Sequence, residues 1–195
     1  MNKLRALFLP LVMAIVVFAC APKEKSVFTE PVDQIDKAAF DQMIDGKQVG
    51  LYTLVNGNGV GMKVTNFGAR IVALCVPDAQ GNPVDVVLGH DNLDDYTAEG
   101  PETFYGAAIG RYGNRIGNAR FELEGNVYEL PANDGANHLH GGFEGYFDVV
   151  WDAEQLSDSK IIFTYLSVDG EMGYPGNLEI SMAYELTDDN AVRIE

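Results

Sequence analysis

The chain has 195 residues, of which 47% are hydrophobic, so it is long enough and apolar enough for one globular domain with its own core. Its 13 lysines and arginines are outnumbered by 29 aspartates and glutamates, which gives a formal net charge of -16. A surface this acidic repels phosphate backbones and excludes nucleic acid as an expected partner. The sequence contains no Walker-type phosphate loop and no dinucleotide-binding glycine fingerprint, and no cofactor is expected.

Residues 1–19 have the pattern of an export signal peptide rather than of a folded element. Two basic residues, Lys3 and Arg5, precede an apolar run over residues 7–19. This run is shorter than the roughly 20 residues that a membrane-spanning helix needs. A small residue stands directly before Cys20, which resembles the cleavage box of bacterial lipoproteins, where the cysteine becomes the lipidated first residue.

A lipid on Cys20 predicts an exported protein that is anchored to a membrane, on the periplasmic side or at the cell surface of a bacterium. The alternative is an ordinary signal peptide in which Cys20 is incidental. Residues 20–46 are polar and mixed, and we expect a tether there, with one or two helical turns over residues 36–44. The second cysteine, Cys75, lies in an apolar run and is expected to be a buried thiol, so no disulfide framework is predicted.

From residue 47 onwards the pattern changes to short strands separated by turns. The sequence Asn-Gly-Asn-Gly at residues 56–59 is a strong signal for a hairpin. No amphipathic helix of more than about ten residues is evident in this part of the sequence. Many strands at close spacing favour an all-β, antiparallel β-sandwich over residues 47–195. The expected strands cover residues 49–55, 60–65, 70–76, 84–88, 120–123, 127–130, 149–156, 160–168, 178–186 and 191–195.

Two short segments carry the polar groups that narrow the function most. Residues 110–116 read Gly-Arg-Tyr-Gly-Asn-Arg-Ile and place Asn114 beside Arg115, and residues 137–142 read Asn-His-Leu-His-Gly-Gly and place His140 before two glycines. A carboxamide donates and accepts, and a guanidinium offers five donors, so these groups can hold a neutral, hydroxyl-rich ligand. The alternatives are a surface arginine paired with one of the many carboxylates and a hydrogen-bonded loop histidine.

The spacing of the histidines also raises the question of a metal site. His138 and His140 are two residues apart and would point the same way on an extended segment, which can suit a metal ion. No third ligand is evident, because Cys75 is expected to be buried and His90 is distant in sequence. We therefore expect no metal, and we interpret His90 as a structural residue.

Five stretches, in the same order, resemble the aldose 1-epimerase, or galactose mutarotase, family. They are residues 66–71 (Asn-Phe-Gly-Ala-Arg-Ile), residues 85–89 (Asp-Val-Val-Leu-Gly), the two segments just described, and residues 169–176 (Asp-Gly-Glu-Met-Gly-Tyr-Pro-Gly). The resemblance covers the chain from about residue 47 to residue 195.

The resemblance implies a β-sandwich of the galactose mutarotase type with a hexose bound in a cleft on one sheet. The family interconverts the α and β anomers of free hexoses such as glucose and galactose without a cofactor. A glutamate takes the proton of the C1 hydroxyl while a histidine protonates the ring oxygen, which is general acid–base catalysis. Carried over by position, Asn114, Arg115 and His140 correspond to substrate-binding residues.

The chain departs from the family pattern in its catalytic residues. The positions of the family's catalytic histidine and glutamate lie beyond Glu195, so the resemblance assigns no catalytic residue here. We therefore expect about the first half of an epimerase domain, inactive by itself. The alternative is a non-catalytic carbohydrate-binding surface lipoprotein built on half a sandwich.

Overall fold

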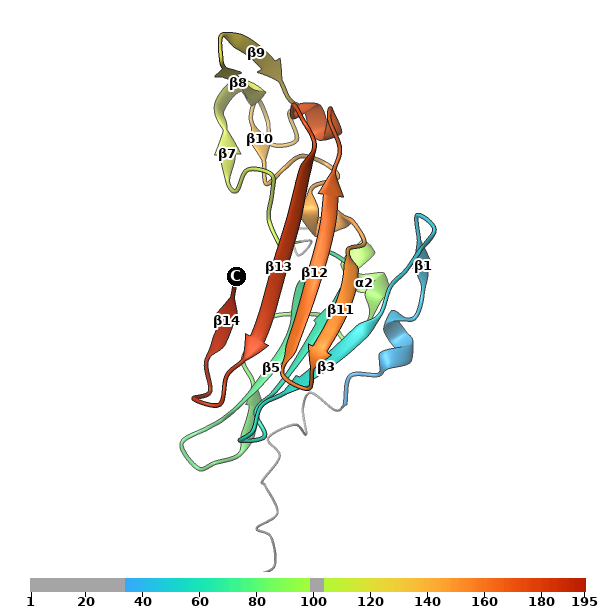
Figure 1. Cartoon of the computed structure of the whole chain (residues 1–195), viewed down its shortest axis with the longest axis vertical. Coiled ribbons are helices and arrows are strands. Elements are labelled where there is room, and N and C mark those ends of the chain that lie inside the picture. Colours follow the sequence, from blue (N-terminus) through green and yellow to red (C-terminus); the bar gives the residue numbers. More distant parts are fainter. Residues whose placement is uncertain (1–33, 99–103) are drawn as a thin grey trace, which may run out of the picture.

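The computed structural model describes residues 34–98 and 104–195, and its main feature is a pair of four-stranded antiparallel sheets packed against each other (Figure 1). The all-β sandwich predicted from the sequence is confirmed. The first sheet has the order β3 (Leu51–Val55), β4 (Gly61–Thr65), β5 (Arg70–Pro77) and β6 (Pro83–Asp85). The second has the order β11 (Asp152–Ser157), β12 (Lys160–Ser167), β13 (Leu178–Leu186) and β14 (Val192–Ile194).

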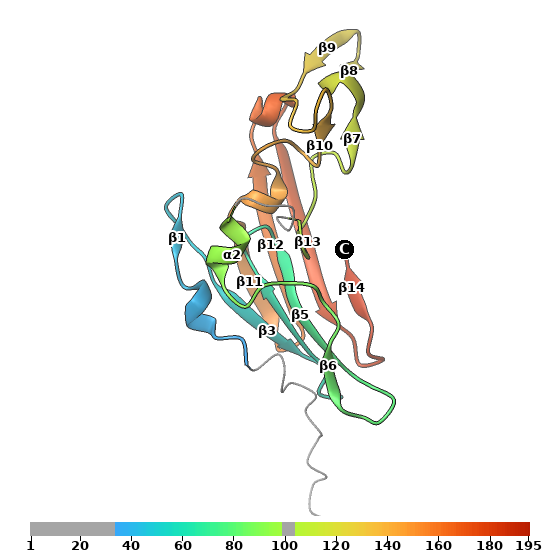
Figure 2. The same ribbon diagram turned by 180° about the vertical axis from the view of Figure 1, so that it is seen from behind.

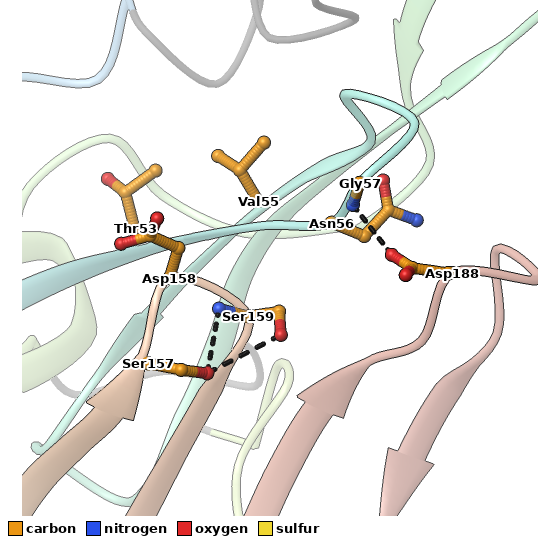
Figure 3. Close-up of a pocket in the computed structure, with 8 residues that line it drawn as sticks. All are labelled: Thr53, Val55, Asn56, Gly57, Ser157, Asp158, Ser159 and Asp188. Atoms are coloured by element: carbon orange, nitrogen blue, oxygen red, sulfur yellow. Dashed lines mark hydrogen bonds between the residues drawn. The ribbon is translucent and has the colours of Figure 1, made fainter.

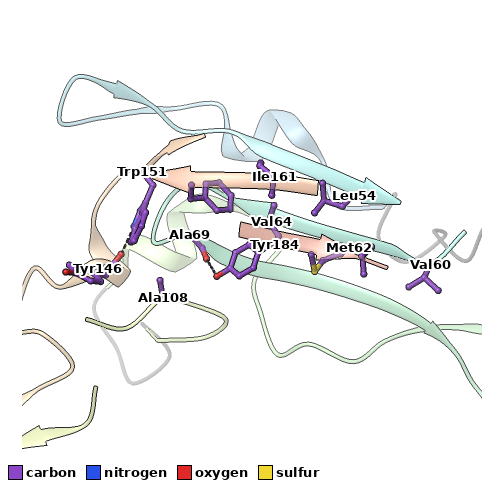
Figure 4. Packing of buried hydrophobic residues seen from close by; sticks show 12 residues of the cluster. Leu54, Val60, Met62, Val64, Ala69, Ala108, Tyr146, Trp151, Ile161 and Tyr184 are labelled. Carbon is purple, nitrogen blue, oxygen red and sulfur yellow. Dashed lines mark hydrogen bonds between the residues drawn. The ribbon is translucent and has the colours of Figure 1, made fainter. Parts of the chain in front are cut away.

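The main hydrophobic core lies between the two sheets (Figure 4). Two of its aromatic side chains are hydrogen-bonded to backbone: the indole N–H of Trp151 donates to the carbonyl of Tyr146 at 3.0 Å, and the hydroxyl of Tyr184 donates to the carbonyl of Ala69 at 2.7 Å. These bonds let large aromatic side chains occupy a dry core at little cost, because a buried polar atom without a partner is destabilising. The first sheet contributes Leu54, Val60, Met62, Val64 and Ala69, and the second Ile161, Phe163, Tyr184 and Leu186.

A second core covers the outer face of the first sheet, so β4 is buried along its whole length. The 3-10 helix η1 (Lys37–Phe40) and the short helix α2 (Leu93–Thr97) supply its lid. The ring of Phe40 lies 6.2 Å from that of Tyr96, measured between centroids. Cys75 is fully buried in this core, as the sequence predicts. No helix in residues 34–98 or 104–195 is both long and apolar enough to cross a bilayer.

Residues 34–46 belong to the fold, so the expectation of a polar tether is wrong for this stretch. Ile35 and Phe40 are buried, and β1 (Met43–Ile44) pairs with β2 (Lys47–Gln48). The hairpin turns through Asp45 and Gly46, with φ of 50° and 76°, which is the Asp-Gly chemistry of tight hairpins. The expected signal peptide, the rest of the tether and Cys20 lie outside the described residues.

Two strands differ from the prediction by three residues at one end, for identifiable reasons. Strand β6 ends at Asp85 rather than at residue 88, because the carboxylate of Asp85 accepts the N–H groups of Leu74 and Val87 in place of ladder bonds. Strand β11 begins at Asp152 rather than at residue 149, because the backbone before it bonds to the first sheet: the N–H of Trp151 donates to the carbonyl of Asn66 at 2.9 Å.

Small elements gather at one end of the molecule, beyond the end of β12 and the start of β13 (Figures 1 and 2). Strand β7 (Arg115–Ile116) pairs with β10 (His138–Leu139), and β8 (Arg120–Leu123) pairs with β9 (Asn126–Glu129). The 3-10 helix η4 (Glu171–Gly173) packs beneath them through a third core of Ala119, Leu130 and Tyr174. The two segments that the sequence analysis singled out therefore meet here.

Candidate functional site

The pairing of β7 with β10 brings Asn114, Arg115 and His140 together. In this antiparallel register Arg115 lies opposite Leu139. The backbone N–H of Asn114 donates to Nδ1 of His140 at 3.0 Å, and the N–H of His140 donates to the carbonyl of Asn114, also at 3.0 Å. The backbones of the two residues are therefore joined directly, and the N–H of Asn114 also fixes the imidazole of His140.

The backbone of the site adopts conformations that most residues avoid. Asn114 and His140 have φ of 64° and 55°, in the left-handed region where asparagine is tolerated better than most residues. Gly141 has φ of 96°, and a Cβ at this position would lie 1.7 Å from the carbonyl oxygen of Gly110. Only glycine lets the two segments approach this closely, which explains the glycine after His140.

Arg115 is anchored at one edge and open at the other. Its Nε donates to Oδ2 of Asp134 at 2.6 Å, and its Nη1 donates to Oδ1 of Asn114 at 3.1 Å. A guanidinium has five N–H groups, so after these two bonds most of its donors still face solvent. The ion pair with a surface carboxylate, which the sequence left open as an alternative, is thus present, and it leaves the guanidinium able to bind a ligand.

The imidazole of His140 is held as a neutral donor. Because Nδ1 accepts the N–H of Asn114, the proton of the neutral ring must be on Nε2. Partial burial, and secondarily the charge of Arg115, lower the pKa of His140 below its ordinary value. The ring also lies edge-on to Phe104, with 4.9 Å between centroids. At neutral pH His140 therefore offers one N–H to a ligand and carries no charge.

His138 has a different environment, and the expectation that it points the same way as His140 is wrong. It is fully buried, with Nδ1 2.8 Å from the carbonyl of Pro131 and Nε2 2.9 Å from the hydroxyl of Tyr174. The positive φ of His140 breaks the extended geometry on which that expectation rested. Within the described ranges no group of three or more metal-ligating side chains occurs.

Two neighbours of the site were not identified from the sequence. Asp134 reads as part of an Asn-Asp-Gly turn, and Phe104 as the first of two adjacent aromatic residues outside the quoted motifs. Neither carries a spacing signal, because each reaches the site only through tertiary contacts. Asn133 adds a third contact of this kind, since its side chain bonds both the N–H and the carbonyl of Leu139, at 2.7 and 2.9 Å.

A separate concavity of about 590 Å³ lies at the turn between β11 and β12 and is lined by polar groups (Figure 3). Its polar groups bond largely to one another: the N–H of Gly57 donates to Asp188 at 2.7 Å, and the N–H of Ser159 donates to Ser157 at 3.2 Å. We interpret it as a junction between turns. Its lining residues are Thr53, Val55, Asn56, Gly57, Ser157, Asp158, Ser159 and Asp188.

Comparison with known proteins gives one family. The family model described as aldose 1-epimerase matches residues 50–195. The chain is 39% identical over 151 residues to an aldose 1-epimerase from Haemophilus influenzae, which covers 77% of this chain and 43% of that protein. It is 43% identical over 123 residues to a galactose mutarotase from Rattus norvegicus, covering 63% of this chain and 35% of that protein.

The solved structures agree. A crystal structure of an aldose epimerase homologue from C. elegans matches with a TM-score of 0.71 and 29% identity, over 75% of this chain and 44% of that one. Galactose 1-epimerase from Lactobacillus acidophilus matches with a TM-score of 0.68 and 31% identity, over 78% of this chain and 45% of that one. The chain spans less than half the length of these relatives, and it belongs to the aldose 1-epimerase family.

Proposed function

We propose that this chain binds a hexose such as galactose or glucose through Asn114, Arg115 and His140, as the sugar-binding part of an enzyme that interconverts α and β anomers. The observation that carries the proposal is the mutual hydrogen bonding of the Asn114 backbone and His140, with Arg115 bonded to the Asn114 side chain. Relatives that are named aldose 1-epimerase and galactose mutarotase support the substrate class.

The three side chains offer hydrogen-bond donors that the hydroxyl oxygens of a sugar can accept. Arg115 offers its remaining N–H groups, the Asn114 amide offers its NH₂, and His140 offers its Nε2–H. Three fixed donors on adjacent backbone would orient a sugar ring and stabilise negative charge on its oxygens. Asp134 offsets the charge of Arg115 and the chain is acidic overall, so a neutral sugar fits the site better than a phosphorylated one.

The same three residues are poorly suited to moving a proton. His140 has its only lone pair occupied by the N–H of Asn114, so it cannot accept the proton of a C1 hydroxyl without losing that bond. Asp134 is engaged by Arg115 at 2.6 Å. We propose that these residues orient the sugar, and that the proton-transfer histidine and glutamate implied by the family resemblance are not supplied by residues 1–195.

The alternative function is a non-catalytic carbohydrate-binding lipoprotein. It is favoured by the same observation, that Asn114, Arg115 and His140 offer hydrogen-bond donors while no group beside them is placed to act as a general base. Both functions share sugar binding and export, with a lipid on Cys20 as the proposed membrane anchor.

The anchor is tested in bacteria that express the chain and are fed radiolabelled palmitate. We expect label in the parent and none in Cys20→Ser, and label retained in Cys20→Ser would reject the anchor.

Sugar binding is tested by titrating the ¹⁵N-labelled chain with D-galactose and recording backbone and side-chain amide spectra. We expect saturable shifts at Asn114, Arg115 and Gly141, and none at Gly57 in the distant junction of Figure 3. Sorbitol, an acyclic polyol, serves as the control for a non-specific effect of hydroxyl groups. Equal shifts with both compounds, or none with galactose, would reject the proposal.

A further inference from the structure

The turn over residues 169–176 is a motif for which the proposed function gives no role. It lies between β12 and β13, contains η4, and lies beside β10 (Figure 1). A hydrogen bond from each loop joins it to the site. Arg111, in residues 110–116, donates to Pro175, and His138, in residues 137–142, is bonded to Tyr174.

Arg111 donates hydrogen bonds to three backbone carbonyls and one side-chain hydroxyl. Its Nη1 donates to the carbonyl of Pro175 at 3.0 Å, and its Nη2 donates to the carbonyls of Ser167 and Val168, each at 2.9 Å. Its Nε donates to the hydroxyl of Ser167 at 2.6 Å. With one bond to the turn and three to Ser167 and Val168 directly before it, this guanidinium fixes the start of the loop that continues to Asn114.

A carboxylate within the turn supports this arrangement. Glu171 accepts hydrogen bonds from the hydroxyls of Ser167 and Tyr165. Since the Ser167 hydroxyl accepts from Arg111 and donates to Glu171, the positive and negative groups are joined through a side chain that is fully buried. Charge-assisted bonds of this kind are stronger and more directional than neutral ones.

The second contact fixes β10. The carbonyl of Pro131 can only accept, so Nδ1 of His138 carries the proton, and Nε2 of the neutral ring accepts from the Tyr174 hydroxyl at 2.9 Å. Burial raises the pKa of Tyr174 to about 12, so the hydroxyl keeps its proton. Gly142 also touches the turn, because a Cβ there would lie 2.9 Å from Met172.

The loops need such support, because β7 and β10 are two residues long and their ends have positive φ at Asn114 and His140. A pair this short has few ladder bonds with which to hold strained backbone.

We propose that the turn 169–176 is the positioning element of the candidate sugar site, acting through Arg111 and through the Tyr174–His138 hydrogen bond. This inference rests on the proposed sugar binding and assigns positioning residues to it.

The test compares Tyr174→Phe and Arg111→Lys with Tyr128→Phe as the matched control. The Tyr128 ring is half-buried and stacks on Phe121 at 5.3 Å, and its hydroxyl has no hydrogen-bond partner among the described residues. Arg111→Lys keeps the charge but loses the fork that spans three carbonyls. Galactose affinity, the unfolding temperature and the ¹⁵N shifts of both imidazoles are measured on each protein.

We expect both test variants to fold and to bind galactose about fivefold more weakly, as for a lost hydrogen bond, with the control unchanged. The imidazole shifts of His138 should move in Tyr174→Phe, and those of His140 in both test variants. A lower unfolding temperature with unchanged affinity would overturn the proposal, and so would failure of both variants to fold. If the parent itself does not bind galactose, the proposed function fails. The positioning role is then judged from the imidazole shifts alone, and unchanged His140 shifts in both variants would reject it.

Discussion

The N–H of Asn114 donates to Nδ1 of His140 across 3.0 Å, so the backbone of one loop determines which ring nitrogen of the other carries the proton. The return bond from the His140 N–H to the Asn114 carbonyl makes the two residues one unit. A charged imidazole would need a proton on Nδ1, directly facing the Asn114 N–H. Protonation and loop geometry are therefore coupled at this site.

This coupling predicts the titration of His140. Partial burial and the nearby charge of Arg115 lower its pKa below 6.5, so the ring should stay neutral until the pH falls below that of an ordinary histidine. Galactose affinity should be constant above this pKa and decrease as the pH falls through it, because protonation breaks the bond to Asn114. A pH titration of the His140 Cε1–H by NMR measures the pKa.

Arg115→Gln is the matched control for this titration. It removes the positive charge, so the pKa of His140 should rise towards 6.5 while the contribution of burial remains. Asp134, which pairs with Arg115, is the other charged side chain bonded into this site, and Asp134→Asn should lower the pKa of His140 further. Titration of the parent at or above 6.5 would contradict the proposed tautomer.

Arg115 should contribute to sugar binding through its open edge. We expect Arg115→Ala to weaken galactose binding by about one order of magnitude, as for hydrogen bonds that involve a charged donor. Arg120→Ala is the control, since Arg120 is an exposed arginine on the nearby β8 and forms no ion pair in the described ranges. Calorimetric titration at one ionic strength compares the two, and equal affinities would remove Arg115 from the site.

The sequence predicted the strands of the two main sheets and of the β8–β9 hairpin, and it singled out the two segments that the structure brings together, because both leave local signals. The two-residue strands β1, β2, β7 and β10 were not predicted, because strands this short show no alternation. Alternating apolar residues, hairpin turns such as residues 56–59, and glycines beside His140 are read directly from neighbouring positions. Asp134 and Phe104 leave no such signal, because they meet Arg115 and His140 only in the folded chain. The direction of His138 was misjudged because the backbone at His140 turns left-handed.

The N-terminal part of the fold was missed for a similar reason. The apolar residues around Phe40 are few and stand in a mixed polar stretch, so the sequence predicted only a helical turn or two within a tether. The structure has such a turn, η1, and buries the ring of Phe40 completely against the outer face of the first sheet. Deleting a fully buried aromatic ring destabilises the fold, because transfer free energy is lost and a cavity is left behind.

Phe40→Ala should therefore lower the free energy of unfolding by about 3–5 kcal/mol. Met43→Ala, at a residue of the same segment that is 61% exposed, should change it by less than about 0.5 kcal/mol. Urea unfolding followed by tryptophan fluorescence measures both, since Trp151 lies in the main core. Similar midpoints for the parent and Phe40→Ala would show that residues 34–46 do not stabilise the domain.

The 195-residue chain by itself should not accelerate the mutarotation of α-D-glucose. Its site presents donors from Asn114, Arg115 and His140, but the one imidazole lone pair is occupied and Asp134 is ion-paired, so no group there is placed to take the C1 proton. Polarimetry of fresh α-D-glucose, with and without the chain, measures the rate, and the Haemophilus influenzae aldose 1-epimerase serves as the positive control. Acceleration that is lost in His140→Ala would show that the lone pair is released during the reaction, and that this histidine transfers protons as well as orienting the sugar.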